Sequence, residues 1–92
     1  MAYRIEFTRQ YLKDLKLARK RGLDEKKLIG VITKLTAGEP LEAKYRDHVL
    51  VGNYKSYREC HISPDWLLIY SKQETFKMVT LMRTGKHSDL FL

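Results

Sequence analysis

Three histidines, an aspartate and an arginine lie in the second half of the chain and could act together on a phosphodiester: His48, His61, Asp65, Arg83 and His87. Cleaving RNA without a metal ion requires a base for the 2′-hydroxyl proton, an acid for the departing 5′-oxygen and a cation for the phosphorane charge. Histidine suits proton transfer because its unperturbed pKa of about 6.5 keeps both forms available near neutral pH. Arginine suits the phosphate because its planar guanidinium can donate two parallel hydrogen bonds. The set therefore meets the chemical requirements of a metal-independent ribonuclease.

Each of these side chains also has a structural interpretation. A single histidine is often a surface or hydrogen-bonded structural residue. Trp66 could stack on a nucleobase, a contact of about 1–3 kcal/mol, or it could pack at the rim of the core. Cys60 stands next to His61, but neighbouring strand residues point to opposite faces, so we expect Cys60 to be a small buried hydrophobe rather than a nucleophile.

Zinc binding is the competing use of the same side chains, because histidine and aspartate are zinc ligands. The candidate ligands are His48, His61, Asp65 and His87. No HxH, HxxxH or CxxC spacing brings any two of them together in the chain. We therefore expect no metal and no small-molecule cofactor, and we favour general acid–base catalysis.

The charge balance indicates a polyanionic partner. Eighteen Lys and Arg against eleven Asp and Glu give a net charge of +7 in 92 residues, which favours nucleic acid or an acidic protein as partner. Residues 1–27 hold nine basic and four acidic side chains, so five of the seven net charges lie there. The first third should form a positive face, although a basic helix can also be a plain solvated surface.

The compartment follows from what the sequence lacks. The lone Cys60 forms neither an internal disulfide nor a CxxC motif, which fits a reducing environment. The longest apolar stretches, Trp66–Tyr70 and Met78–Met82, are far shorter than the roughly 20 residues of a membrane span. No secretory signal precedes the first strand. We expect a cytoplasmic protein without membrane contact.

The first half of the chain predicts a strand and two helices. Alternating apolar residues predict a strand at residues 2–7. Thr8 and Asp24 are predicted N-caps of two helices that end at Gly22 and before Gly38. The buried stripes should be formed by Tyr11, Leu12, Leu15 and Ala18 in the first helix and by Leu28, Ile29, Ile32 and Leu35 in the second. The two helices should form a hairpin.

The second half predicts three more strands. Residues 41–53 show neither period and should be an ordered surface connection. Strands are predicted at 57–62, 66–71 and 77–83, with turns at 63–65 and 73–75. The order is β-α-α-β-β-β, an α+β fold in which an antiparallel meander packs against the helical hairpin. Because no repeat or linker interrupts this pattern, we expect one domain over residues 1–92.

This arrangement should bring the chemistry-bearing residues to one rim. His61 lies near the end of one predicted strand, and Asp65 and Trp66 occupy the following turn and the next strand's start. Arg83 and His87 follow the last strand, and ordinary antiparallel geometry allows them to reach the same place.

In these residues the chain resembles the YafQ-type toxins of the RelE superfamily. The likeness covers essentially the full length and is carried by the segments Tyr45–His48, Tyr57–His61, Pro64–Tyr70 and Arg83–Phe91. It implies a RelE-like fold, ribosome-dependent cleavage of mRNA in the A site with inhibition of translation, and neutralisation by a cognate antitoxin protein. One departure is Val49, where proline is expected in close relatives.

The resemblance also assigns roles. It implies a catalytic set of His48, His61, Asp65, Arg83 and His87, with Trp66 and Phe91 as substrate-positioning residues. Arg83 would bind the scissile phosphate, His87 would act as general acid, and Asp65 or His61 as base. The basic first helix would grip ribosomal RNA (16S) through Lys13, Lys16, Arg19 and Lys20. The alternative is a non-catalytic module of the same fold that binds RNA, the ribosome or an antitoxin.

Overall fold

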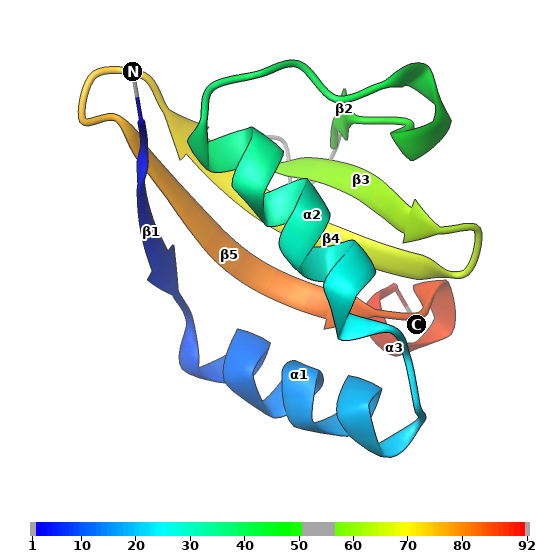
Figure 1. Ribbon diagram of the computed structural model, residues 1–92. Helices are drawn as coiled ribbons and strands as arrows, with labels where there is room; N and C mark the ends of the chain where they lie inside the picture. Colours follow the sequence, from blue (N-terminus) through cyan, green and yellow to red (C-terminus); the bar gives the residue numbers. More distant parts are fainter. Residues whose placement is uncertain (1, 51–56, 92) are drawn as a thin grey trace.

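The computed structural model describes residues 2–50 and 57–91, and it has the α+β fold with the expected core of elements (Figure 1). The elements in chain order are β1 (Arg4–Phe7), α1 (Arg9–Lys20), α2 (Glu25–Thr36), the 3-10 turn η1 (Ala43–Tyr45), β2 (His48–Val49), β3 (Arg58–Ser63), β4 (Trp66–Gln73), β5 (Met78–Gly85) and α3 (His87–Leu90). The short β2 and α3 were not predicted. The connection expected at 41–53 lies partly outside the described residues, and its described part contains η1 and β2.

One mixed sheet with the strand order β1-β5-β4-β3-β2 carries the described part of the chain. The β3-β4-β5 meander is antiparallel as predicted, whereas β1 pairs with β5 in parallel. Both predicted N-caps are confirmed: Thr8 Oγ1 accepts from the Tyr11 N–H at 2.9 Å, and Asp24 Oδ1 accepts from the Lys26 N–H at 3.0 Å. Local capping chemistry therefore fixes where both long helices begin.

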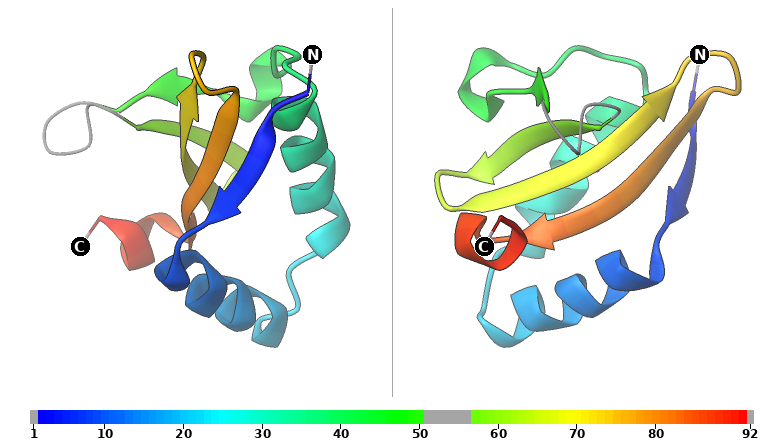
Figure 2. Two further views of the ribbon diagram at one scale, coloured as in Figure 1. Left: turned by 90° about the vertical axis from the view of Figure 1, so that its left-hand side faces the viewer. Right: turned by 180° about the vertical axis from the view of Figure 1, so that it is seen from behind.

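The sheet has a different helix on each face, as Figure 2 shows. Helix α2 crosses one face, α3 lies against the other, and α1 packs along β5 where β1 has ended. The main core lies on the α2 face and includes Tyr11, Ala18, Leu28, Val31, Leu35, Cys60, Leu68 and Leu81. On the α3 face, Leu67 and Ile69 pack against Leu90.

Two residues predicted for the buried helix stripes are half exposed. Leu12 and Ile29 face solvent, and the position in α2 that packs into the core is Val31. Leu28, Val31, Ile32 and Leu35 follow the i, i+3, i+4, i+7 spacing, whereas Ile29 is turned about 100° from Leu28 around the helix axis. The predicted burial of Cys60 is confirmed, since no part of it is exposed. Among the described residues no helix is long and apolar enough to cross a membrane.

Candidate active face

The strand register places three of the predicted catalytic residues on one face of the sheet. His48 pairs with Glu59, Glu59 with Ile69, and Ile69 with Arg83, while His61 pairs with Leu67 in the adjacent row. Directly paired residues project from the same side of a sheet. Because Ile69 and Leu67 pack against Leu90, that side is the α3 face. His48, His61 and Arg83 therefore project from the face that also carries α3, which we call the candidate active face.

A β-bulge determines where Arg83 points. Val79 and Leu81 face the main core, so strict alternation would turn residue 83 toward the core as well. The β4–β5 register shifts between Ile69 and Tyr70, where Met82 is the extra residue. A bulge of this kind re-aims the side chains that follow it. Arg83 consequently stands opposite Ile69 on the α3 face.

The row from His48 to Arg83 spans most of the sheet. It crosses three strand spacings of about 4.8 Å each, so the two backbones lie about 14 Å apart. His61 lies in the next row, toward the Pro64–Asp65 turn.

Asp14 holds the Arg83 guanidinium and was not predicted. Its carboxylate accepts hydrogen bonds from Arg83 Nε and Nη2, each at 3.0 Å, and from the Thr84 N–H at 3.2 Å. Gln10 Nε2 donates a further bond at 3.1 Å. Asp14 lies on the buried side of α1, between Tyr11 and Ala18. A carboxylate within an apolar helical stripe was the signal in the sequence that could have identified it.

Glu59 is the second unpredicted residue, and it contacts His48. His48 Nδ1 lies 2.6 Å from the Arg46 carbonyl oxygen, which can only accept, so this nitrogen carries a proton. His48 Nε2 lies 2.9 Å from Glu59 Oε2. Glu59 is buried, and its Oε1 has no hydrogen-bond partner among the described residues. Both ring nitrogens of His48 are thereby engaged, which fixes the orientation of the ring.

The segment before His48 is anchored by Asp47. The Asp47 carboxylate accepts from Arg58 Nη2 at 3.1 Å and from the hydroxyl of Tyr70. Burial, followed by the hydrogen bond to Asp47, raises the pKa of the Tyr70 hydroxyl well above its usual value. Arg46 adopts a left-handed backbone with φ 48°, a conformation that non-glycine residues rarely take. These contacts fix the backbone immediately before His48.

Helix α3 presents His87 and Phe91, whose ring centroids lie 4.9 Å apart. Asp89 caps this helix and ties it to the end of α1: its Oδ2 accepts from the N–H of the N-cap residue Lys86 at 2.9 Å and from Arg21 Nη1 at 2.7 Å. A Cβ at Gly85 would lie 3.2 Å from the same Asp89 oxygen, so a larger residue there would require the Asp89 side chain to shift by a few tenths of an ångström. Phe91 packs partly buried against Leu90 and its neighbours.

Trp66 requires a correction. The sequence suggested a stacking platform for a nucleobase, but the tryptophan is 2% exposed and belongs to the main core on the α2 face. Its Nε1 donates to Thr84 Oγ1 at 2.8 Å, and Thr84 Oγ1 in turn donates to the Leu67 carbonyl at 2.7 Å. With both ring faces covered by protein, Trp66 fixes the alignment of β4 and β5 and does not present a surface to RNA.

The remaining predicted residues are more exposed. Asp65 is open to solvent in the β3–β4 turn, with Lys86 Nζ at 4.0 Å from its Oδ2. Arg19 is committed to Glu25, because its Nε and Nη2 donate to that carboxylate at 2.8 and 2.9 Å. The described residues contain no cluster of three or more His, Cys, Asp and Glu suited to a metal ion. The four zinc-ligand candidates are therefore not gathered into one ligand set.

Comparison with known proteins gives a consistent result. The family model described as "Bacterial toxin of type II toxin-antitoxin system, YafQ" matches residues 3–92. The chain is 48% identical to the mRNA interferase toxin YafQ of Escherichia coli strain K12, over 95% of this chain and 94% of that protein. The crystal structure of YafQ from E. coli strain BL21(DE3) superimposes with a TM-score of 0.92 at 42% identity, covering 98% of this chain and 99% of that one. YafQ in the E. coli DinJ–YafQ toxin-antitoxin complex gives a TM-score of 0.91 at 44% identity, with both chains covered completely.

Proposed function

The chain belongs to the YafQ family of bacterial type II toxins, and on that premise we propose that it is an mRNA interferase that cuts messenger RNA on the ribosome. In this proposal residues 1–92 form one toxin domain that acts in the cytoplasm, needs no metal ion and stops translation by cleaving the codon in the A site. The relative from E. coli strain K12 is named an mRNA interferase. The observation that carries the proposal furthest is the common projection of His48, His61 and Arg83 toward the α3 face.

The proposed reaction is an in-line attack of the ribose 2′-oxygen on the adjacent phosphorus. Asp65 or His61 accepts the 2′-hydroxyl proton, the bond from phosphorus to the 5′-oxygen breaks, and His87 donates a proton to that departing oxygen. The products are a 2′,3′-cyclic phosphate and a free 5′-hydroxyl, so protons and charge balance without an added reactant. Arg83 binds the non-bridging oxygens, where negative charge accumulates in the transition state.

The fixed positions of the basic groups support this assignment. Asp14 holds two of the five donors of Arg83, so the guanidinium is oriented before substrate arrives. His48 is held between the Arg46 carbonyl and Glu59, and we propose that its fixed ring lies against the RNA backbone next to the cut. Preorganised donors of this kind stabilise a transition state without reorganisation at the moment of reaction.

Two partners complete the proposal. A cognate antitoxin should cover the basic face with an acidic or amphipathic segment that orders on binding; YafQ of E. coli is seen in complex with DinJ. The ribosome should be gripped by Lys13, Lys16 and Lys20 on α1 through 16S ribosomal RNA phosphates. Arg19 contributes less to this contact, because Glu25 neutralises it.

The test uses ribosomes programmed with a defined mRNA. Wild-type protein is expected to cut within the A-site codon, mapped by 5′ ends, and to leave the same mRNA intact when ribosomes are omitted. Arg83→Ala and His87→Ala should each lower the cleavage rate by about 10²–10⁴-fold while circular dichroism shows the fold retained. Arg4→Ala removes an exposed cation on β1 and serves as the control with wild-type cleavage. Growth unaffected by the wild-type toxin without antitoxin would favour the non-catalytic module instead.

A further inference from the structure

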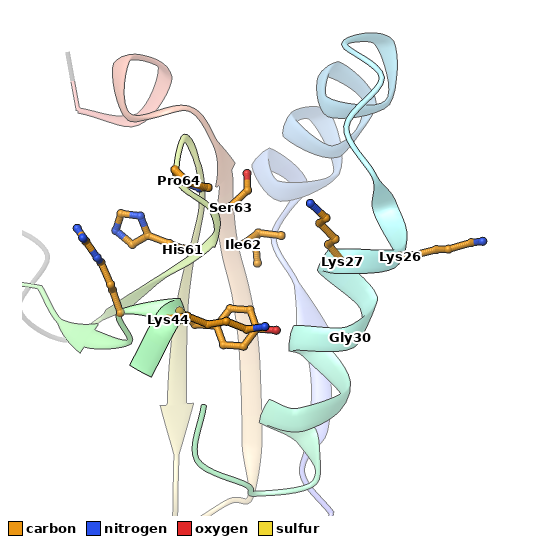
Figure 3. A pocket seen from close by; sticks show the side chains of 10 residues that line it. Lys26, Lys27, Gly30, Lys44, His61, Ile62, Ser63 and Pro64 are labelled. Atoms are coloured by element: carbon orange, nitrogen blue, oxygen red, sulfur yellow. The ribbon is translucent and has the colours of Figure 1, made fainter. Parts of the chain in front are cut away.

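A basic cavity of about 690 Å³ lies beside the candidate active face. It is bounded by the first turns of α2, by η1 and by the C-terminal end of β3. Among the described residues, β2 does not extend along this end of β3, so its outer edge is unpaired there. Lys27, Gly30, Lys44, Arg46, His61 and Ser63 are among its lining residues. In Figure 3 Lys44 extends across toward α2 near Gly30, Lys27 reaches toward Ser63, and Lys26 points away from β3. Cations thus approach the cavity from two opposite walls.

The cations of the cavity form no ion pair with a described carboxylate, although the charge of Lys44, after the hydrogen bond from Lys34, helps to lower the pKa of the Glu42 carboxyl. Four of the ten lining residues are Lys or Arg and none is acidic, so the cavity attracts anions. The neighbouring carboxylates are engaged elsewhere: Glu42 accepts from Lys34 Nζ at 2.9 Å, and Asp47 is held by Arg58 and Tyr70. No ion pair to a described residue forms at Lys27, Lys44 or Arg46.

Gly30 is an independent sign that the cavity is kept open. Glycine is disfavoured in a helix interior relative to alanine. Yet Gly30 stands in the middle of α2, and a Cβ built there would meet nothing within 4 Å. Packing therefore does not require glycine at this position. What the missing side chain preserves is free space in the cavity wall.

The residues that line the cavity favour nucleic acid over a protein segment as its ligand. An amphipathic segment docks through an apolar stripe, but none of the large exposed hydrophobic residues of the described chain lines this cavity, and the Ile62 that does is buried. His61 belongs both to the cavity wall and to the α3 face. A strand of RNA lying across the α3 face would reach the cavity by passing round β3 at His61, because the cavity lies on the α2 side of the sheet.

We propose that the cavity between α2, η1 and β3 is a phosphate-binding subsite that holds the RNA backbone next to the cleaved bond. Lys27 and Lys44 grip a phosphate from opposite walls, and Arg46 at the rim donates to the same strand. The subsite rests on the proposed function, since it names where the substrate of that reaction is held. It adds a contact that fixes the RNA relative to His61.

The test measures binding of a 2′-O-methyl tetranucleotide, which lacks the nucleophilic hydroxyl and cannot be cleaved. In ¹H–¹⁵N NMR titrations, the amides of Gly30 and Arg46 are expected to shift. Lys27→Gln/Lys44→Gln should weaken binding about tenfold and lower the salt slope by about 0.7, because the one phosphate that both lysines bind is no longer neutralised. Gly30→Leu should weaken it as well, by filling the cavity without changing any charge. The matched control, Lys72→Gln/Lys77→Gln, removes the same two charges from the β4–β5 hairpin and should keep the wild-type affinity.

Four results would overturn the subsite. The first is that the wild-type protein does not bind the tetranucleotide at millimolar concentration, and the second is that the amide shifts are confined to α1. The third is that the control variant loses as much affinity as Lys27→Gln/Lys44→Gln. The fourth is that Gly30→Leu keeps the wild-type affinity. An acidic-peptide site is the other possibility: if Lys27→Gln/Lys44→Gln weakens binding of a ten-residue poly-glutamate probe but not of the tetranucleotide, the RNA assignment is wrong. Inorganic phosphate that competes out the tetranucleotide at the shifted amides supports recognition of the phosphate group itself. Since none of these readouts requires cleavage, failure of the subsite is distinguishable from failure of the proposed function.

Discussion

The Asp14 carboxylate on α1 accepts hydrogen bonds from Nε and Nη2 of Arg83 on β5, both at 3.0 Å. The C-terminal end of the same helix contacts α3, because Nη1 of the C-cap residue Arg21 donates to Asp89 Oδ2 at 2.7 Å. Helix α1 therefore positions the proposed phosphate-binding arginine and the helix that carries the proposed general acid, His87. This link makes α1 a support of the candidate active face, although the helix contributes none of the proposed reacting groups.

Removing the Asp14 carboxylate should show how much of the effect of Arg83 depends on the orientation of its guanidinium and how much on its charge. Asp14→Ala leaves the Arg83 guanidinium and the Thr84 N–H without this partner, so we expect the free energy of unfolding to fall by about 2–3 kcal/mol. The cleavage rate should fall more than the apparent substrate affinity, because the guanidinium keeps its charge but loses its orientation. Urea unfolding and single-turnover cleavage measure the two effects.

Asp24→Ala is the matched control for this change. It also removes a carboxylate that accepts from a backbone N–H, at a cost of about 1 kcal/mol, but it touches no residue of the active face. Its cleavage rate should equal that of the wild type well below the melting temperature. Wild-type cleavage by Asp14→Ala would refute the positioning role.

Trp66→Phe tests whether the tryptophan is structural. The variant loses the hydrogen bond from Nε1 to Thr84 Oγ1 but keeps an aromatic ring in the core, so the free energy of unfolding should fall by about 1 kcal/mol. Cleavage should be unchanged at a temperature where both proteins are folded. A large loss of substrate affinity at unchanged stability would instead mean that the ring stacks on RNA.

The Arg21–Asp89 pair should make stability depend on pH. The hydrogen bond from Arg21, followed by that from the Lys86 N–H, holds the pKa of the Asp89 carboxyl below its usual value. A lowered folded-state pKa stabilises the protein above the unfolded value of about 3.9, and the contribution is lost as pH falls through the folded pKa.

Asp89→Asn should therefore be less stable than the wild type at pH 6, by at most about 1 kcal/mol for this partly exposed pair. The difference should shrink below pH 4 and in 1 M NaCl, where charges are screened over about 3 Å. Urea unfolding at pH 6 and pH 3 measures it. If the difference in free energy of unfolding between Asp89→Asn and the wild type stays constant over this pH range, the ionised Arg21–Asp89 pair is not its source.

The Cys60 thiol should be unreactive toward thiol reagents in the folded protein. Burial raises the pKa of its thiol far above the usual value, so the reactive thiolate is absent as well as inaccessible. We expect a thiol reagent such as DTNB to react only at the rate of global unfolding, and Cys60→Ala to cleave RNA normally while losing about 1 kcal/mol of stability. Rapid labelling of native protein would contradict this.

Cleavage should not depend on zinc. The described His, Asp, Glu and Cys residues form no cluster that could hold a metal ion. A zinc-selective chelator, used with magnesium kept at the level ribosomes need, should leave the cleavage rate unchanged. Activity lost with the chelator and restored by added zinc would replace the acid–base mechanism with a metal-assisted one.

Local chemistry made much of this fold predictable. Thr8 and Asp24 cap their helices because a side-chain oxygen satisfies a free backbone N–H within three residues. The three-stranded meander follows from short turns between alternating segments. The positive charge and the residue types of the candidate active face could likewise be read from the sequence, since they depend on composition and order alone.

The tertiary structure decided which of those residues point where. Leu81 and Arg83 lie two apart on β5 and alternation alone places them on one face; the bulge opposite Ile69 and Tyr70 separates them. Trp66 lies in the main core, where Thr84 on another strand accepts its hydrogen bond. Asp14 and Glu59 became parts of the site through partners that folding brings close. The sequence by itself determined the elements and the chemistry available, because caps, periods and turns are local; register, bulges and ion pairs join distant segments, so only the folded chain could select the face on which that chemistry meets.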